Sequence, residues 1–482
     1  MRIKRLALLL PSVLLGACAT VSVPSDVLRD ITVSGGVISG QYPTFIDGEG
    51  VGELFDDSLQ SKYLSKKKQA WVQFESPKTE VVRAYSLTSA SDAPARDPVS
   101  WSLLASMDGD NWQVLHQVDQ HRFDGRTQTK RFALENQQAF RFYRLDMQQN
   151  GKTPWGDEYL QLADISLYAR TKLPLAGFSQ SSQVIAPGQT IFLTSTSENQ
   201  PSGYVWYTPG GQQRGSGEKI QVTYAQPGVY GVNLQTENAY GTDFIERPFA
   251  VKVLEPAKPW LGFKPPKVII NFEDSESEGA KRLMRLMPDL QGDINNVTHQ
   301  LVKRLYKNFA QVPDFEQVEF QLKWMDTLAY RAGSDKKMVI AFSSKYITER
   351  LKDQADEQVR YELLGVLWHE LVHGYQLMPK NRSYGGDPGV HAYIEGMADL
   401  VRIQAGFHKT RTPKPSDSWL GGYTNTGFFL SYLADTYEPD LAYKFNQSAL
   451  TLDDWSFEKA IQSIIGKPID SLWQEYQQSL AH

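Results

Sequence analysis

The segment LLGVLWHELVHGYQ, from Leu363 to Gln376, is the feature that most restricts how this chain of 482 residues can fold. The segment is apolar enough to form a buried helix, yet it carries His369, Glu370 and His373 in its middle. On a helix, two histidines four positions apart lie one turn apart on the same face. Burying two unpaired imidazoles and a carboxylate is costly, and a bound metal ion removes that cost. The segment therefore predicts a metal-holding helix, with a core helix that tolerates a few polar residues as the alternative.

A catalytic zinc ion takes three protein ligands and a water molecule, so His369 and His373 need one more partner. Glu395 lies 22 residues beyond His373 in the segment HAYIEGMADLVR, and Asp399 follows it at helical spacing. We expect Glu395 to be the third zinc ligand and Asp399 to accept a hydrogen bond from a ligand histidine. His391 is the competing third ligand. It is disfavoured because it is expected to precede the helix and has no partner at helical spacing.

The remaining catalytic roles fall to residues around this cluster. Glu370 points round the helix from the two histidines, which places it to take a proton from a metal-bound water. An oxyanion formed in such a reaction needs a hydroxyl or an imidazole to stabilise it. Tyr423, in the segment GGYTNTG, is the first candidate, followed by Tyr384 and His391. Ordinary packing is the alternative for Tyr423, and Gln376 is expected to be a structural hydrogen-bonding residue.

Three separated segments resemble, in the same order, the plant-type basic secretory protein family of peptidases. They are GVLWHELVHGYQ, IEGMADLVRIQAGF and WLGGYTNTGFFLSYL, and the resemblance extends over residues 267–475. The pattern of histidines and acidic residues also looks like that of the gluzincin zinc peptidases. The resemblance implies a zincin-like domain that uses one Zn²⁺ to hydrolyse peptide bonds. The chain departs from the family name because its net charge is −5 and because it carries additional β-rich segments.

The periodicity of the chain divides it into two β-rich parts and a helical part. Residues 36–170 and 174–254 read as short alternating strands broken by Gly, Asp, Asn and Pro, which is typical of β-sandwiches. The proline-rich segment 255–266 is expected to be a stiff linker. Residues 267–482 combine strands with helical periodicity, most extensively over 346–376. The predicted fold class is therefore multidomain, with two all-β sandwiches followed by an α+β domain.

The first β-rich part resembles the discoidin, or coagulation-factor type C, family of carbohydrate-binding sandwiches. The resemblance rests on the segments RDPVSWSLLASMDGDNW, RFYRLDM and QLADISLY. It implies a discoidin-like jelly roll whose loops at one end bind a glycan. Trp155 and Tyr159, in the polar loop KTPWGDEYL, are the candidates for stacking on a sugar. The acidic stretch from Asp47 to Asp57 is a candidate Ca²⁺ site, because carboxylate oxygens suit a hard cation, and a solvated loop is the alternative.

The second β-rich part resembles a PKD-type immunoglobulin-like domain. The resemblance rests on the segment VTYAQPGVYGVNLQTENAYG and on Trp206, which is expected in the core of the sandwich. In the first part, Trp101, Trp112 and Tyr143 lie on alternating strands and are expected in the core as well. The expected role of the PKD-like domain is that of a spacer.

The N-terminus reads as an export signal that ends at the only cysteine. Three basic residues among the first five precede the apolar run LALLLPSVLLGA, which is too short for a membrane span of about 20 residues. The segment Leu-Gly-Ala-Cys18 resembles the bacterial lipobox, which implies that residues 1–18 are a lipoprotein signal and that Cys18 is lipidated. Ala19 after the cysteine implies sorting to the outer membrane, and residues 19–35 are expected to be a tether. A plain signal peptide is the alternative.

These observations favour an exported, lipid-anchored zinc endopeptidase that acts on proteins or glycoproteins, with the discoidin-like domain as a glycan-binding module. The mild negative charge gives no indication of nucleic acid binding, and contact with the membrane is expected only through the lipid. One alternative is a carbohydrate-binding adhesin whose C-terminal domain binds zinc but turns over poorly. Another is an envelope protein that faces the peptidoglycan and cleaves or senses wall peptides.

Overall fold

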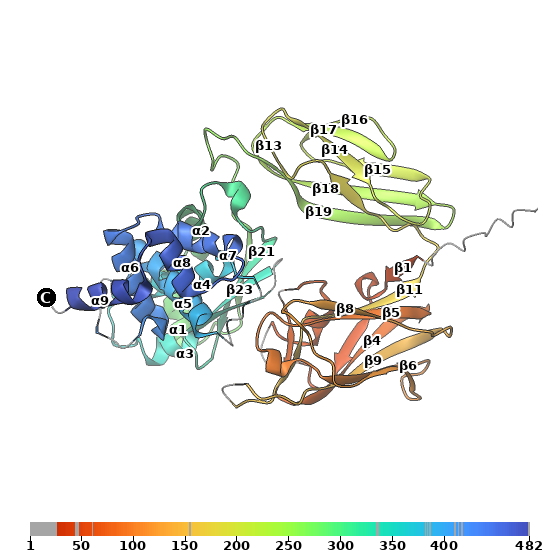
Figure 1. Cartoon of the computed structure of the whole chain (residues 1–482), viewed down its shortest axis with the longest axis horizontal. Helices are drawn as coiled ribbons and strands as arrows, with labels where there is room; N and C mark the ends of the chain where they lie inside the picture. The colour runs from red at the N-terminus through yellow and green to blue at the C-terminus, as the bar shows by residue number, and fades with distance from the viewer. Residues whose placement is uncertain are drawn as a thin grey trace, which may run out of the picture.

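The fold-class prediction is confirmed: two β-sandwiches precede an α+β domain (Figure 1). The computed structural model describes a part of the chain that excludes the predicted signal segment 1–18, Cys18, Asp47 and Trp155. The described residues are 27–43, 48–59, 61–153, 156–333, 337–380, 382, 384, 387–408, 411–412, 414–415 and 418–480. None of the helices within these ranges is long and apolar enough to cross a membrane.

The first sandwich is built from two antiparallel sheets and a separate strand pair. Strand β4 shows why it folds, because alternate residues from Ala70 to Ser76 are buried while their neighbours face outward. The five-stranded sheet has the order β2 (Val37–Gly40), β4 (Gln69–Glu80), β9 (Phe140–Gln148), β6 (Ser100–Ser106), β7 (Gln113–Val118). The four-stranded sheet has the order β1 (Leu28–Asp30), β11 (Asp164–Arg170), β5 (Val82–Thr88), β8 (Thr129–Ala133), and β10 (Leu160–Leu162) pairs with β3 (Tyr63–Ser65).

Two expectations for this sandwich need correction. It begins at Leu28 and not at residue 36, because β1 pairs with the end of β11 through Leu28 and Arg170. The segment 19–35, expected to be a tether, therefore contributes a strand, which at three residues is too short to show an alternating pattern. Trp101 and Tyr143 are buried as expected, but Trp112 is only half-buried and lies under the guanidinium of Arg144, 4.0 Å from the ring centroid.

The second sandwich also consists of two four-stranded sheets. Trp206 is buried in it, and its indole nitrogen donates a hydrogen bond to the carbonyl of Gly217. One sheet has the order β12 (Phe178–Gln180), β14 (Thr190–Ser195), β17 (Lys219–Tyr224), β16 (Gly211–Arg214). The other has the order β13 (Val184–Ile185), β19 (Gly241–Val253), β18 (Gly228–Asn238), β15 (Gly203–Tyr207).

The C-terminal domain combines a four-stranded sheet with nine described helices. Strands β20 (Lys267–Phe272), β21 (Gln317–Lys323) and β23 (Lys337–Ser343) run parallel, and β22 (Ala329–Gly333) is the antiparallel edge strand beside β23. The sequence did not indicate β22. The helices are α1 (Glu278–Leu286), α2 (Leu290–Leu305), α3 (Ser344–Glu349), α4 (Asp356–Tyr375), α5 (Pro388–Gln404), α6 (Tyr423–Thr436), α7 (Leu441–Thr451), α8 (Phe457–Ile465) and α9 (Ile469–Ser479).

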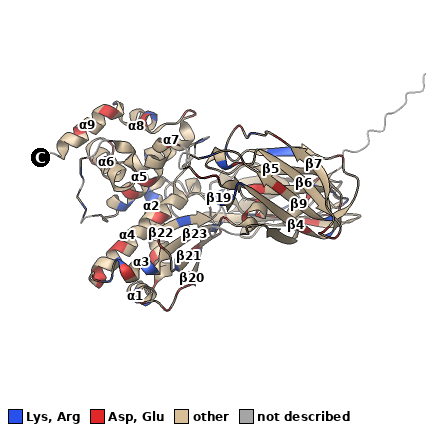
Figure 2. Cartoon of the chain, turned by 90° about the horizontal axis from the view of Figure 1, so that it is seen from below, with Lys and Arg blue, Asp and Glu red and all other residues tan. Residues whose placement is uncertain are grey.

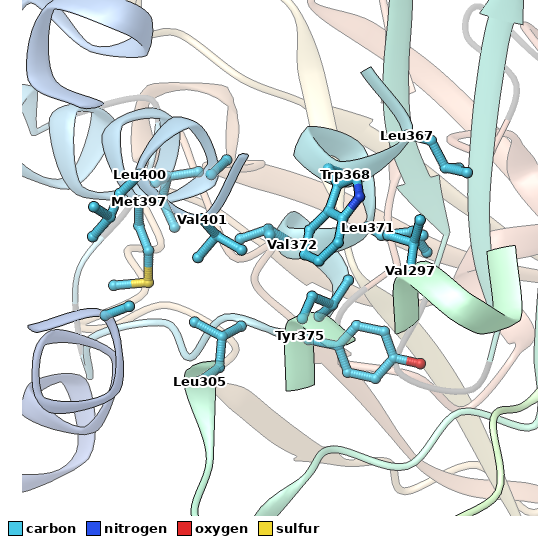
Figure 3. Close-up of a cluster of buried hydrophobic side chains, with 14 of the residues drawn as sticks. Val297, Leu305, Leu367, Trp368, Leu371, Val372, Tyr375, Met397, Leu400 and Val401 are labelled. Carbon is cyan, nitrogen blue, oxygen red and sulfur yellow. The ribbon is translucent and has the colours of Figure 1, made fainter. Parts of the chain in front are cut away.

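Helices α4 and α5 supply many of the buried apolar side chains of this domain, some of which are drawn in Figure 3. The expected helical run over 346–376 is split into α3 and α4, and α4 starts at Asp356, whose carboxylate accepts hydrogen bonds from Arg282 and Arg285 of α1. A carboxylate at a helix N-terminus is favoured by the helix dipole. Because α4 is apolar on most sides, α2, α5 and the sheet all pack against it. The apolar contacts in Figure 3 come from Val297 and Leu305 of α2, Leu367, Trp368, Leu371, Val372 and Tyr375 of α4, and Met397, Leu400 and Val401 of α5.

The PKD-like sandwich is held at both of its ends. At one end, Asn238 donates a hydrogen bond to the carbonyl of Lys172, directly after the first sandwich. At the other end, Lys252 forms an ion pair of 2.8 Å with Asp314 and donates to the carbonyl of Val312 in the C-terminal domain. Both views show the sheet β20–β23 on the side of the C-terminal domain that faces the two sandwiches (Figures 1 and 2).

Asp164 gives the first sandwich a testable pH dependence. Its carboxyl group lies in the buried start of β11, and burial, followed by the charge of Asp57, raises its pKa to about 7. A carboxyl group with a raised pKa favours the folded state while it is protonated, and this contribution is lost as the pH rises through 7. We therefore expect Asp164→Asn to raise the free energy of unfolding at pH 8 by roughly 2 kcal/mol more than it does at pH 5.

Urea unfolding followed by tryptophan fluorescence at the two pH values checks this expectation. Asp119→Asn, which removes an exposed carboxylate of the same sandwich, is the matched control. An equal gain for Asp164→Asn at both pH values would contradict the assignment.

Candidate metal centre

Helices α4 and α5 bring three ligand groups together between them. His369 and His373 of α4 and Glu395 of α5 each offer one atom, and these atoms lie within 4.8 Å of one another. Oε2 of Glu395 is 3.2 Å from Nε2 of His369 and 3.5 Å from Nε2 of His373. They are the only such group of three or more histidine, cysteine or acidic side chains in the described part of the chain. The three residues are those that the sequence pattern singled out.

The other nitrogen of each imidazole has its own hydrogen-bond partner. Nδ1 of His369 donates to Oδ1 of Asp399 over 2.8 Å, and Nδ1 of His373 donates to Oε1 of Gln376 over the same distance. Gln376 is itself oriented, because its amide nitrogen donates to the carbonyl of Ile394 in α5. In both rings, Nε2 is the nitrogen that faces Oε2 of Glu395. Such partners fix the ring orientation and raise the basicity of the imidazole as a ligand.

The spacing of these atoms fits a tetrahedral zinc ion. At Zn–N and Zn–O distances of about 2.0–2.1 Å, two ligand atoms of a tetrahedron lie about 3.3 Å apart. The two distances to Glu395, 3.2 and 3.5 Å, bracket this value. Imidazole nitrogens and a carboxylate oxygen are also the donor types that zinc takes at sites with one open position. The residues present therefore fit a zinc ion held by His369, His373 and Glu395.

Close packing of α5 against α6 sets the position of the acidic residues of α5. A Cβ on Gly427 of α6 would lie 2.6 Å from Cβ of Asp399, and a Cβ on Gly396 of α5 would lie 2.4 Å from Thr426. Both distances are too short for real contacts, so the helices approach this closely only because glycine occupies the two positions. The close approach keeps Asp399 buried beside His369, 2% exposed.

The histidines also decide the charge state of the two acidic residues on α5. Burial alone would raise the pKa of Glu395, but the hydrogen bonds and charges of His369 and His373 outweigh it and hold the pKa below its usual range. Burial acts on Asp399 in the same way, and His369 and His408 likewise lower its pKa. Both groups therefore stay ionised, as an acceptor and a metal ligand must.

For Glu370, the effect of burial on the pKa outweighs the effect of the neighbouring histidines. It is buried beside the cluster, and burial raises the pKa of its carboxyl group even though the charges of His373 and His369 oppose the rise. A carboxyl group with a raised pKa is a better proton acceptor at neutral pH than an ordinary glutamate. It lines the same cavity as the ligand cluster, together with Arg331 of β22.

Two residues of the cluster were not indicated by the sequence. The buried ring of His408 lies 3.3 Å from Oδ1 of Asp399, so this carboxylate contacts both His408 and His369. Arg402 lies 4.0 Å from Asp399 and pairs with Glu362 of α4 at 3.2 Å. Arg402 stands at helical spacing after Asp399 and could have been found by that pattern. His408 follows the end of α5 with a φ of 63°, and no local signal places it.

The aromatic candidates lie on the open side of the cluster. The hydroxyl of Tyr384 donates to Oε1 of Glu395 over 2.5 Å, so it supports a ligand. The ring of Tyr423 stacks on His369 with 5.9 Å between centroids, and this residue is 50% exposed. Its φ of 43° is uncommon for a bulky residue. Strain of this kind is frequent at functional sites, which favours a role at the cluster over simple packing.

His391 lies inside α5 and not before it, which corrects the reason for which it was disfavoured. Asp387 accepts hydrogen bonds from the backbone of Gly389 and Val390 as the N-cap, and Pro388 is the first helical residue. His391 therefore stands one turn before Glu395. Its ring packs against Tyr384 and Tyr423, with centroids 5.3 and 5.9 Å away, and it is not part of the ligand group.

Two family models match the chain. Residues 265–476 match the family described as a peptidase of plants and bacteria, abbreviated BSP, and residues 176–243 match the PKD domain. The match to the peptidase family covers most of the C-terminal domain.

The chain is also similar to one curated protein and to several solved structures. A peptide-N(4)-(N-acetyl-beta-glucosaminyl)asparagine amidase from Arabidopsis thaliana is 32% identical over 123 residues, which cover 24% of this chain but only 16% of that relative. The N-terminal region is similar to CpGH89CBM32-5 from Clostridium perfringens in complex with GalNAc-beta-1,3-galactose, at 12% identity over 29% of this chain and 100% of that chain (TM-score 0.26). It is also similar to the family 32 carbohydrate-binding module of Streptococcus pneumoniae EndoD, at 17% identity over 30% of this chain and 100% of that chain (TM-score 0.25). A third similar structure is an F5/8 type C domain from Bacteroides fragilis, at 16% identity over 30% of this chain and 97% of that chain (TM-score 0.25).

The peptidase domain is the part of the chain for which a binding site emerges clearly, whereas the sites expected in the first sandwich do not. Trp155 lies outside the described residues, and the guanidinium of Arg96 lies 5.3 Å from the ring centroid of Tyr159. In the acidic stretch from Asp47 to Asp57, Asp47 also lies outside the described residues. The carboxylate of Asp56 accepts hydrogen bonds from Ser58 and Ser61. The glycan and Ca²⁺ sites therefore stay predictions.

Asp399 offers a direct test of how the centre is held. Asp399→Asn keeps the size of the side chain but removes the charge that orients His369 and contacts His408. We expect it to weaken zinc binding by about 10- to 100-fold, because partners of ligand histidines typically contribute this much. Competition with a chromophoric chelator measures the affinity. Asp435→Asn, at an exposed position near the end of α6, is the control, and an unchanged affinity for Asp399→Asn would contradict the assignment.

Proposed function

We propose that the protein is a zinc-dependent endopeptidase that is exported and attached to the cell envelope by a lipid. The observation that carries the proposal is the convergence of His369, His373 and Glu395 at zinc-ligand spacing beside a buried Glu370. The match of residues 265–476 to a peptidase family supports the reaction class. A protein or glycoprotein is the proposed substrate.

The mechanism assigns one role to each side chain. A zinc ion held by His369, His373 and Glu395 would lower the pKa of a bound water and polarise the carbonyl of the substrate. Glu370 accepts the proton of the attacking water and returns it to the leaving amine. Tyr423, half-exposed beside His369, donates its hydroxyl hydrogen bond to the oxyanion. Tyr384 and Asp399 hold Glu395 and His369 in place.

Strand β22 supports binding of an extended polypeptide. It pairs only with β23 among the described strands, lies beside α4, and its residues line the cavity that contains Glu370 and the ligand cluster. An edge strand offers backbone groups to which an extended peptide can add as a further strand. Such recognition suits cleavage within a chain, which favours an endopeptidase.

The anchoring and glycan parts of the proposal rest on sequence patterns. The lipobox-like segment before Cys18 supports export and attachment to the outer membrane, and mass spectrometry of the N-terminal peptide would reject the anchor if Cys18 is unmodified. The resemblance of the first sandwich to discoidin modules supports contact with glycan-bearing substrates. A glycan array with the whole protein would reject this part if no sugar is retained.

Glu370→Gln tests the mechanism. We expect this variant to keep about one zinc per chain, because Glu370 is not a ligand, and to lose peptidase activity by at least about 10³-fold, because the proton acceptor is gone. Elemental analysis and cleavage of labelled casein measure the two properties. His369→Ala, which should lose the metal, is the control. A Glu370→Gln variant that cleaves like the wild type would reject the mechanism, and a zinc-loaded wild type without turnover would favour the adhesin.

Tyr423→Phe tests the oxyanion role. The substitution keeps the ring that stacks on His369 and removes only the hydroxyl, so kcat should fall by about 10²-fold while zinc affinity stays unchanged. Tyr384→Phe is the matched comparison, and it should lower zinc affinity because it removes a hydrogen bond to Glu395. Steady-state kinetics and chelator competition distinguish the two effects. An unaltered kcat in Tyr423→Phe would leave the tyrosine with a packing role.

A further inference from the structure

The cavity at the zinc site is lined by two domains. It has a volume of about 670 Å³ and contains the ligand cluster, Glu370 and residues of β22 on its inner side. The residues that line it from the first sandwich come from three loops, before 3-10 helix η2 (Val51–Phe55), before β3 and after β5. They are Gly48, Glu49, Ser61, Lys62, Ser91 and Asp92.

The first sandwich also touches the edge strand of the peptidase sheet. A Cβ on Gly48 would lie 3.4 Å from Cβ of Ala332 and 3.7 Å from the backbone nitrogen of Gly333. These distances are ordinary van der Waals contact, so Gly48 packs against the end of β22. Ala332 and Gly333, at the point of contact, line the cavity together with the preceding residues of β22.

Hydrogen bonds within the first sandwich hold the three loops in shape. The backbone nitrogen of Leu64 donates to the carbonyl of Glu49 over 3.0 Å. The carbonyl of Asp92 accepts hydrogen bonds from Gln161, at 2.7 Å, and from Arg126, at 3.1 Å. Gln161 is buried, and Arg126 is paired with a buried aspartate, Asp97. The wall of the cavity is therefore built by the sandwich itself and needs no substrate to order it.

The charges on this wall do not balance. Nζ of Lys62 lies 2.6 Å from Oδ2 of Asp92 and 3.6 Å from Oε1 of Glu49, so one cation faces two carboxylates. Burial raises the pKa of Glu49, Lys62 lowers it, and the charge of Asp92 raises it again, while the charge of Arg96 lowers it least. Because Arg96 is itself paired with Asp157 at 2.8 Å, two cations face three carboxylates here, and a further positive charge would relieve the repulsion between Glu49 and Asp92. On the opposite side of the cavity, Arg402 and Arg411 are paired with Glu362, and Arg331 of β22 interacts with the charge of Glu370, so the excess negative charge remains on the sandwich side.

We propose that the first sandwich forms the outer wall of the substrate cleft, where Glu49 and Asp92 select a substrate with a lysine or arginine side chain on the side facing the sandwich. The proposal rests on the proposed peptidase function and adds a specificity that the catalytic cluster does not determine. An extended substrate beside β22 presents alternate side chains away from α4 and toward this wall. A basic side chain there adds the positive charge that the wall lacks.

Cleavage of a synthetic peptide library by the whole zinc-loaded protein after removal of the signal segment tests this specificity. The library contains randomised peptides in two forms, bare and carrying one O-linked N-acetylgalactosamine, and mass spectrometry reads the cleavage sites. We expect lysine and arginine to be enriched about tenfold at one fixed position in the wild type. The double variant Glu49→Gln, Asp92→Asn should lose this enrichment while it cleaves neutral sequences within about twofold of the wild type. Glu75→Gln, which removes a carboxylate of the same sandwich outside the cavity, is the matched control.

Kinetics on one basic and one neutral peptide separate selection from folding defects. In the wild type, KM for the basic peptide should rise with ionic strength, because salt screens partly exposed charges, whereas kcat should not change. In the double variant this salt dependence should disappear. A general loss of structure would instead lower kcat for both peptides.

Three other outcomes would overturn the proposal, and each has a different meaning. Cleavage without a basic preference, or with a preference that survives in the double variant, rejects the selecting role of Glu49 and Asp92 and leaves the peptidase function intact. Cleavage of the glycosylated peptides alone would mean that the wall takes sugar hydroxyls and not a cation. No cleavage of either form by the zinc-loaded wild type would reject the peptidase function and this specificity together.

Discussion

The rest of the peptidase domain depends on the buried polar cluster between α4 and α5. His369 contacts Asp399 through one ring nitrogen and Glu395 through the other, and Asp399 also contacts His408. Groups of this polarity can be buried only when each one is paired. The apolar core around α2, α4 and α5 supplies the burial, and the glycines of α5 and α6 allow the helices to approach closely enough for the pairing. The burial of the polar cluster and the close packing of the helices around it therefore depend on each other.

Local periodicity explains which parts of this site the sequence could predict. His369 and His373 are one helical turn apart, and so are Glu395 and Asp399, so spacing alone assigns each pair to one helix face. The two pairs come together only in the tertiary structure, and the family resemblance predicted that they would. The expected position of His391 was wrong because Asp387 and Pro388, a usual pair of helix-start residues, begin α5 before it. That cap is a local signal, and it is sufficient to place His391 on the helix.

Other features depend on contacts that no local pattern records. Strand β22 has the sequence AYRAG and is half-buried throughout, so it shows neither alternation nor an apolar run and is fixed by its pairing with β23. Strand β1 is fixed in the same way by pairing with β11, far along the chain. Tyr384 and His408 reach the cluster from segments outside the helices. The end of the first sandwich that lines the cavity is the largest example, because loops of one domain there face the ligand cluster of another.

The way in which the PKD-like domain is held has a consequence for how substrate meets the wall of the cleft. Its hydrogen bond to Lys172 and its ion pair with Asp314 leave no long flexible connection between the first sandwich and the peptidase domain. Two modules joined by a flexible linker meet at an effective concentration that the linker length sets. Here a folded domain takes the place of such a linker, so the loops of the first sandwich stay beside the ligand cluster. The width of the cavity between them then depends on the PKD-like sandwich, none of whose described residues lines that cavity.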